Sequence, residues 1–407
     1  MLRSLTLLAL PVLATQAAAQ SVIVVDDTPG PGVDHATIQD GIDAAGPSDV
    51  ILVRAGSYAG FTIDGKGAKI IADVQGTAIS GVVGIANVGA ADEVVLNGFH
   101  ITSGLGTALD VQACAGTVWL ENLSIDSSGT PVFMVNDGAR FTTCDSVVIT
   151  DCAITSGGSL LAGANGGGNG LLAQLSNVWL YDTTVEGGTI AGSVPGAPGL
   201  SVSGGEAFAS GCTFTGGRGG DGGLVGPFQV CEDGAVGGIG VNVTGNSLVR
   251  LFDSVGIGGP GGTSGGLGCS NGAQGPATFT GAGAQLIEQN PVFGSRSYEI
   301  PNPITSGQTG VLSWTGVPGE LAWGVFSITQ TPFYFPLFNG IYAPGAPQIL
   351  LYVGTIPQSG QLDIPITVNL QPGKPFVFIW EQGLFYSLED GFVLGTPRGS
   401  LILGQSF

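Results

Sequence analysis

A repeated pattern of short apolar stretches constrains the fold of this chain more than any other feature. Each repeat has two apolar positions one residue apart, then a polar turn, then a second short stretch; the six repeats begin at Glu93, Thr117, Ser146, Asn177, Glu206 and Leu248. A third apolar stretch precedes most of them, as in ALDVQA, PVFMVN, GLLAQL, GLSVSG and GIGVNV. Repeats this short bury their apolar face only by stacking on one another. We therefore predict an all-β fold, a right-handed parallel β-helix with three strands per coil.

Alignment of the repeats predicts which side chains face the core. One ladder consists of Leu96, Leu120, Ile149, Leu180, Ala209 and Leu251, and a second consists of Ile101, Ile125, Ile154, Val185 and Phe214. The alternative architecture is an antiparallel sandwich of hairpins, in which loops are short and paired strands are adjacent in sequence. The steady three-strand repeat favours the β-helix.

The segments before and after the repeats differ from them. The stretch HATIQDGIDAAG places Ile38, Ile42 and Ala45 on one helical face, so we predict a short helix that caps the first coil. Beyond about Leu286 the glycine runs stop and alternating apolar strands appear between turns. We predict a parallel β-helix domain over residues 21–285 and a small antiparallel β-sandwich over residues 286–407.

The N-terminal 20 residues have the features of a secretory signal peptide. Arg3 is followed by a short apolar run and by small residues up to Ala19. We expect cleavage near Gln20, and hence a secreted, extracellular or cell-surface protein. No later run reaches the ~18 apolar residues of a transmembrane helix, so no membrane-spanning segment is predicted.

Composition narrows the classes of partner. The formal net charge is −20 with only 10 basic residues, which disfavours nucleic acid and anionic membranes as partners. The chain contains only 2 histidines, so a multi-histidine zinc or iron site is nearly excluded. No cofactor is specifically indicated, and Ca²⁺ is the one ion that the acidic residues suggest.

One family resemblance is carried by the start of the expected β-helix. Asp49, Val53, Gly56 and Tyr58 match a D-x-x-x-V-x-x-G-x-Y strand pair that follows a capping helix in pectin lyase-like proteins. The chain resembles that superfamily over residues 21–283. The resemblance implies the fold but not an activity, because the superfamily includes lyases, hydrolases, epimerases, adhesins and scaffolds.

The catalytic patterns of the resembled enzymes are missing from this sequence. The lyase pattern needs a basic residue beside clustered carboxylates, and the polygalacturonase pattern needs N-T-D, D-D, H-G and R-x-K elements. The remaining weak catalytic candidates are Asp126 and Glu186, which are expected to face outward two coils apart and to flank a sugar.

Outward-facing aromatic residues form a second set of candidates. Trp119, Trp179 and Phe208 share one outward position of the repeat, with Val148 between the two tryptophans, and Tyr181 occupies the next outward position. An exposed stripe of rings would bind a glycan because sugar faces stack on rings. The alternative is that the C-terminal module or a long loop covers this stripe.

Three aspartates are weak candidates for a metal site. Asp151 and Asp182 share one turn position on adjacent coils, where a Ca²⁺ site is one interpretation and a turn with left-handed backbone is the other. Asp221 lies in the stretch GGRGGDGGL, which nearly matches a calcium-binding nonapeptide. The more economical interpretation of residues 216–240 is a long surface loop.

The 6 cysteines divide into three pairs. Cys114 and Cys144 share a turn on adjacent coils, so we predict a disulfide between them. Cys231 and Cys269 lie in the two longest glycine-rich segments, and we predict a second disulfide there. Cys152 and Cys212 are expected two coils apart, beyond disulfide reach, and therefore buried and free.

Two classes of function remain open. The first is a non-catalytic module that binds polysaccharide or a cell-surface protein, or has a structural role. The second is a carbohydrate-active enzyme, either a polysaccharide lyase or a glycoside hydrolase. The missing motifs and the scarcity of basic residues favour the first.

Overall fold

The computed structural model describes residues 20–407 except 105, 128–135, 159–167, 190–191, 226–229, 267, 291–293, 339 and 406. The predicted signal peptide, residues 1–20, therefore lies outside the described residues except for Gln20. The chain divides into two compact units. One comprises Val24–Ala44 and Val53–Gln289, and the other comprises Asn290–Phe407 with the short segments Met1–Ile23 and Ala45–Leu52.

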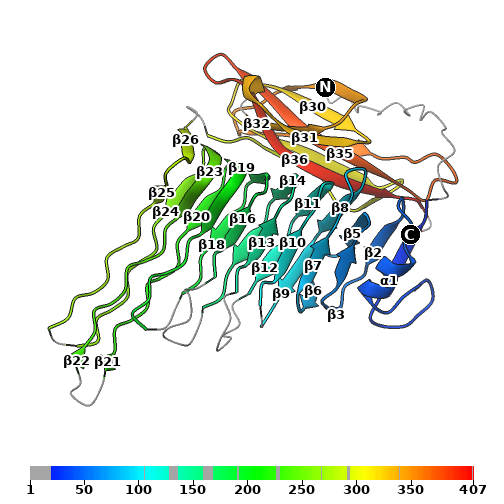
Figure 1. The fold of residues 1–407 in the computed structure, drawn as a ribbon. Coiled ribbons are helices and arrows are strands. Elements are labelled where there is room, and N and C mark those ends of the chain that lie inside the picture. The colour runs from blue at the N-terminus through cyan, green and yellow to red at the C-terminus, as the bar shows by residue number, and fades with distance from the viewer. Residues whose placement is uncertain are drawn as a thin grey trace. The chain divides into compact units, whose positions relative to one another are not determined.

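The larger unit is a parallel β-helix whose coils stack in three rows of strands (Figure 1). The first row contains β1 (Val22–Val25), β2 (Val50–Val53), β5 (Ala68–Ala72), β8 (Glu93–Asn97), β11 (Thr117–Glu121), β14 (Ser146–Thr150), β17 (Val178–Tyr181), the later parts of β19 (Leu200–Ser210) and β23 (Val241–Phe252), and β26 (Gln285–Gln289). The second contains β4 (Thr62–Asp64), β7 (Val83–Ala86), β10 (Leu109–Gln112), β13 (Ala139–Thr142), β16 (Leu171–Gln174), the earlier parts of β19 and β23, and β25 (Thr278–Thr280). The third contains β3 (Ser57–Ala59), β6 (Thr77–Ser80), β9 (Phe99–Thr102), β12 (Ser124–Asp126), β15 (Ala153–Thr155), β18 (Thr184–Glu186), β20 (Thr213–Thr215) and β24 (Val255–Ile257).

The predicted inward ladders are confirmed. Leu96, Leu120, Ile149 and Leu180 are in register on successive strands, and all four side chains are fully buried. The second ladder likewise runs through the third row. One strand was placed wrongly: β13 occupies the position expected for PVFMVN, of which all but Asn136 lies outside the described residues.

The six turns between the first and third rows from β8 onward need left-handed backbone. The positive φ angles at this one turn position belong to Gly98, Asn122, Asp151, Asp182, Gly211 and Asp253. Asn, Asp and Gly tolerate this conformation better than other residues. The turn interpretation of Asp151 and Asp182 is therefore confirmed.

The predicted N-terminal cap is α1 (Ile38–Ala44), with Ile38 and Ile42 buried. The side-chain amide of Gln39 acts as a substitute strand beside β4. Its Oε1 accepts from the Thr62 N–H at 2.9 Å, and its Nε2 donates to the Thr62 carbonyl at 3.2 Å. The backbone N–H and carbonyl of Thr62 at the edge of β4 are thereby hydrogen-bonded, so this part of the edge is not available for pairing with another strand.

The four motif residues fix the first coil. Asp49 accepts hydrogen bonds from the N–H groups of Ser21 and Gly46, both at 2.8 Å. The Tyr58 hydroxyl donates to the Arg54 carbonyl at 2.9 Å. A Cβ atom at Gly56 would lie 2.7 Å from a carboxylate oxygen of Asp27, so a side chain does not fit there.

The glycine-rich segments form an ordered bundle instead of the surface loop that we expected. We call residues 192–199, 216–225, 230–240, 258–266 and 268–277 the Gly arms; Figure 1 shows them as extended segments leading toward the small hairpin of β21 (Leu224–Val225) and β22 (Val230–Cys231). The N–H groups of Gly216, Gly219 and Gly222 donate to Ile257, Pro260 and Thr263 at 2.8–2.9 Å. Every third residue of this arm thus donates to the same neighbouring segment, residues 257–263. A repeat of three residues is the period of a polyproline II helix.

A second set of hydrogen bonds connects the Gly arms laterally. The N–H groups of Gly217, Gly238, Gly259 and Gly275 donate in turn to Ala197, Gly217, Gly238 and Gly259 at 2.7–2.8 Å. The arms pack so closely that a Cβ atom at many of these glycines would lie under 3.0 Å from a neighbouring carbonyl oxygen. Glycine is required here because only backbone fits between the arms.

The C-terminal unit contains two antiparallel-rich sheets, in agreement with the predicted all-β class. The smaller contains β27 (Ser297–Glu299), β29 (Thr309–Thr315) and β34 (Gln361–Thr367), and the larger contains β28 (Ile304–Thr305), β36 (Gly391–Leu403), β35 (Phe376–Ser387), β30 (Leu321–Ser327) and β33 (Gln348–Thr355). Tyr298, Leu312, Trp314, Ala322 and Phe385 pack between them. A hairpin of β31 (Gln330–Phe335) and β32 (Gly340–Pro344), joined through the 3-10 turn η1 (Pro336–Phe338), completes the unit.

Candidate functional site

The aromatic stripe predicted as a ligand surface is buried. Trp119, Tyr181 and Phe208 are 1% exposed and Trp179 is 8% exposed. The Trp119 Nε1–H donates to the buried Glu121 carboxylate at 2.9 Å, and the rings of Tyr181 and Phe208 are 5.9 Å apart. The prediction of an exposed stripe is therefore wrong.

The difference from the sequence prediction has a physical reason. Every described residue of β11 except the first is buried, as is every residue of β17, whereas β12 and β18 bury only their inward residue. Strands covered on both faces carry nearly continuous hydrophobic runs, as TVWLE and VWLY do. The burial of both faces agrees with the alternative that the aromatic stripe is covered.

Asp126 and Glu186 lie where the repeat placed them. Both are in register with Thr155 between them, so they are two strand spacings apart, about 9.6 Å at ~4.8 Å per strand. They project from the outer face of the third row, Asp126 partly exposed and Glu186 exposed.

Sequence reasoning missed one polar pair on the same outer face. The His100 Nδ1 and the Ser124 Oγ are 3.0 Å apart on adjacent strands. A nucleophile beside a base resembles a hydrolytic dyad, but catalysis also needs a group that orients the base and donors for the oxyanion. In the described part of the chain, the hydrogen bond of the His100 ring goes to Ser124, and no third side chain is seen to orient the ring.

Asp151 and Asp182 line a shallow groove on adjacent coils. The groove has a volume of about 310 Å³ and is also lined by Phe99, Asn122 and Ser124. Within the described ranges, no group of three or more His, Cys, Asp or Glu side chains is arranged to hold a metal ion. The groove is therefore a place where two carboxylates stack, without a full set of cation ligands.

Asp221 connects two Gly arms. Its carboxylate accepts from Arg218, and from both the N–H and the hydroxyl of Thr263 at 2.7 Å. The Arg218 guanidinium, followed by the Thr263 bonds, lowers the pKa of the Asp221 carboxyl to about 2. Because both oxygens already accept hydrogen bonds from the protein, this arrangement favours a structural role over a calcium ligand.

Of the two predicted disulfides, Cys231–Cys269 is confirmed, with Cα atoms 6.0 Å apart. The predicted Cys114–Cys144 disulfide is wrong, because both are free thiols. Each donates instead to the carbonyl two residues before it in its own tight turn, Gln112 at 3.3 Å and Thr142 at 3.5 Å. The neighbouring Cys144 thiol lowers the pKa of the Cys114 thiol, and the same interaction raises the pKa of Cys144. Cys152 and Cys212 are buried and free, as predicted.

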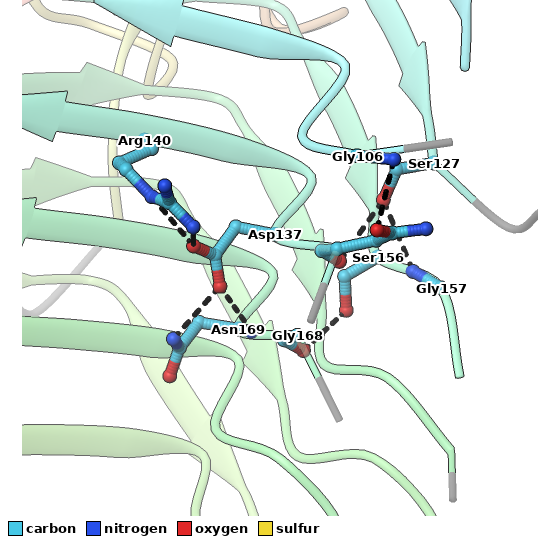
Figure 2. A network of polar contacts seen from close by, with 9 residues as sticks. Gly106, Ser127, Asp137, Arg140, Ser156, Gly157, Gly168 and Asn169 are labelled. Carbon is cyan, nitrogen blue, oxygen red and sulfur yellow. Dashed lines mark hydrogen bonds and ion pairs between the residues drawn. The ribbon is translucent and has the colours of Figure 1, made fainter. Parts of the chain in front are cut away.

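A network of polar contacts lies next to β13, in the segments that connect the third row of strands to the second (Figure 2). The buried Asp137 carboxylate accepts from the Arg140 Nε and Nη2 atoms at 2.9 and 2.7 Å, and from the Asn169 N–H and Nδ2 at 2.8 and 2.9 Å. Ser127 accepts from the Gly157 N–H at 3.0 Å, and Ser156 donates to the Gly168 carbonyl at 2.6 Å. The bonds from Asn169 to Asp137 and from Gly157 to Ser127 connect successive coils, so the network joins the coils to one another.

A connected group of partly exposed aromatic side chains lies in the C-terminal unit. We call it the aromatic cluster; its rings belong to Trp323, Phe333, Phe335, Phe338, Tyr342, Tyr352, Tyr386 and Phe392. Consecutive ring centroids are 4.6–6.2 Å apart, so the rings form one connected group. Tyr352, Phe333 and Phe392 are exposed by 52%, 44% and 37%.

The five-stranded sheet positions this cluster. One face of the sheet packs against the smaller sheet, while Val325, Leu384 and Leu394 on the opposite face contact Trp323, Phe338 and Tyr342. One feature of the sequence marks the strands that carry most of the aromatic cluster. No charged residue and no histidine stands between Glu320 and Asp363 in a chain with 10% charged residues.

Comparisons with known proteins give no relative from which function could be transferred. No protein-family model matches the chain, and no curated protein matches it. Among solved structures, it is similar to the superoxide reductase (neelaredoxin) from Ignicoccus hospitalis at 8% identity, with 27% of this chain and 81% of that chain covered and a TM-score of 0.16. That score carries no argument about fold or activity. None of the helices in the described segments is long and apolar enough to cross a membrane.

Proposed function

We propose that this chain is an exported, non-catalytic member of the pectin lyase-like β-helix superfamily that binds a neutral polysaccharide through the aromatic cluster. The observation that carries the proposal is the connected set of rings with Tyr352, Phe333 and Phe392 exposed. Exposed apolar patches of this kind mark binding surfaces. The exposed faces of these rings offer stacking surfaces to the apolar faces of pyranose rings.

The charge distribution supports a neutral ligand. The stretch between Glu320 and Asp363 contributes Trp323, Phe333 and Tyr352 to the cluster and contains no charged side chain. A polyanionic glycan such as pectate would meet a chain of net charge −20 without local basic residues to compensate. Superfamily membership is supported by the parallel coils and by the structural roles of Asp49 and Tyr58 in the first coil.

The test is a binding assay with insoluble cellulose, starch and pectate, using the full chain. We expect retention on a neutral polysaccharide and none on pectate. Trp323→Ala and Tyr352→Ala should each weaken retention at least tenfold. Phe407→Ala is the matched control, because this ring is 43% exposed and lies outside the cluster. Equal retention of all three variants would refute the proposal.

A second candidate function is glycoside hydrolysis on the outer face of the third row. One observation favours it: Asp126 and Glu186 lie in register on strands whose backbones are about 9.6 Å apart, and inverting enzymes place their two carboxyl groups ~6.5–9.5 Å apart. Release of reducing ends that is abolished in both Asp126→Asn and Glu186→Gln would support the enzyme and contradict the non-catalytic proposal.

A further inference from the structure

The two ends of the β-helix differ in how their strand edges are satisfied. At the N-terminal end, the Gln39 amide exchanges hydrogen bonds with Thr62, and the Lys66 ammonium donates to the Ile42 carbonyl, so α1 is fastened over the first coil. At the other end, β24 pairs only with β20, and β25 and β26 pair only with β23, within the described residues. These three strands therefore present a free edge of backbone donors and acceptors.

Several outward-facing side chains on this last coil are apolar and exposed. Val255, Ile257, Phe279 and Ile287 are 48%, 40%, 48% and 37% exposed. Their in-register neighbours one coil earlier are polar, namely Thr213, Thr215, Asn242 and Arg250. The change from polar to apolar occurs on the second and third rows of the same coil, whereas the outward positions of the first row are apolar on most coils. Exposed apolar side chains gathered in this way are typical of a surface that is covered by a partner.

The charge of this end suits a second copy of the same chain. Only Asp253 and Glu288 are charged within residues 253–289, although the whole chain has a net charge of −20. Most of the negative charge thus stays away from a contact between two copies. Standard interfaces use about 20–30 residues from each side, and the last coil with its adjoining arms supplies that many.

We propose that the last coil is the contact face of a two-fold dimer in which β24 pairs antiparallel with its own copy. A two-fold axis through Gly256 places Val255 opposite Ile257 of the second copy, an apolar cross-strand pair. The same axis brings β25 toward β26 of the second copy, so Phe279 and Ile287 are covered as well. Because a two-fold contact uses the same face of both copies, the contact closes as a dimer and does not extend into a fibre.

The test is sedimentation velocity on the full chain. We expect a dimer at about 100 µM, where a micromolar Kd gives nearly complete association. The double variant Ile257→Lys and Phe279→Lys should sediment as a monomer with an unchanged melting temperature, because both side chains are exposed in the single chain. The matched control Val82→Lys, at a position 41% exposed on an early coil, should remain a dimer.

Each other outcome would overturn the proposal. A monomeric wild-type chain would do so, and so would a dimer that survives the double variant. Dissociation by Leu350→Lys alone would place the contact on β33. Strong hydrogen-exchange protection of β24 in a monomer would mean that another part of the same chain covers this end.

Discussion

Replacing Gly237 with alanine tests the close packing of the Gly arms. A Cβ atom there would lie well under 3.0 Å from the Gly259 carbonyl oxygen, and that neighbour is backbone that has no rotamer to change. Overpacking of this kind costs about 1–3 kcal/mol. Displacing the arm also weakens the bonds from Gly237 to Ala273, from Gly238 to Gly217 and from Gly259 to Gly238, each worth about 1 kcal/mol. We expect a total of about 3–5 kcal/mol.

The assay combines thermal unfolding by circular dichroism with amide hydrogen exchange. At about 2 °C per kcal/mol for a unit of this size, Tm should fall by about 6–10 °C. If the arms open separately from the coils, exchange at their amides should rise first. The control is Gly223→Ala, because a Cβ atom at Gly223 meets nothing within 4 Å. Equal behaviour of the two variants would refute the packing argument.

Three further predictions concern other contacts. Arg296→Met should destabilise the C-terminal unit by about 3–5 kcal/mol in urea unfolding, because the buried Glu320 loses a partner at 2.9 Å, and adding Glu320→Leu should restore most of the loss. Cys231→Ser opens a cross-link of sequence separation 38 and should destabilise the arms by about 4 kcal/mol, read out by exchange; unchanged protection would contradict this. Burial raises the pKa of the Cys212 thiol to about 12, so the stability it contributes is complete below pH ~9 and is lost as pH rises toward 12. In Cys212→Ala, the urea concentration at the unfolding midpoint should depend less on pH between pH ~8 and ~10.5. The same pH dependence in the variant and the wild type would refute that assignment.

Local periodicity made the coils predictable. The inward residues Leu120 and Ile149 repeat because every coil must bury the same positions, so alignment of the sequence gives the register. The turn residues Asn122 and Asp182 follow from the need for left-handed backbone. The Cys231–Cys269 disulfide was found because composition alone marked two related segments.

The candidate site was not predictable in the same way. Trp119 and Tyr352 are both aromatic residues on strands, yet one is 1% exposed and the other 52%. Exposure depends on what covers a face, and a repeat contains no information about that. The neutral stretch around Trp323 was visible in the sequence, but only the ring contacts show that its aromatic side chains gather on one surface.

The amino-acid sequence by itself determined the β-helix, its register, its N-terminal cap and one disulfide, because each depends on residues related by a short repeat or by a local turn. Only the tertiary structure decided that the aromatic stripe is buried and that the Gly arms form a bundle. It also decided that Cys114 and Cys144 are free thiols and that Val255 and Phe279 on the last coil are exposed. These outcomes depend on contacts between distant segments, where the burial of a side chain and the room for a Cβ atom are set by the packing partner.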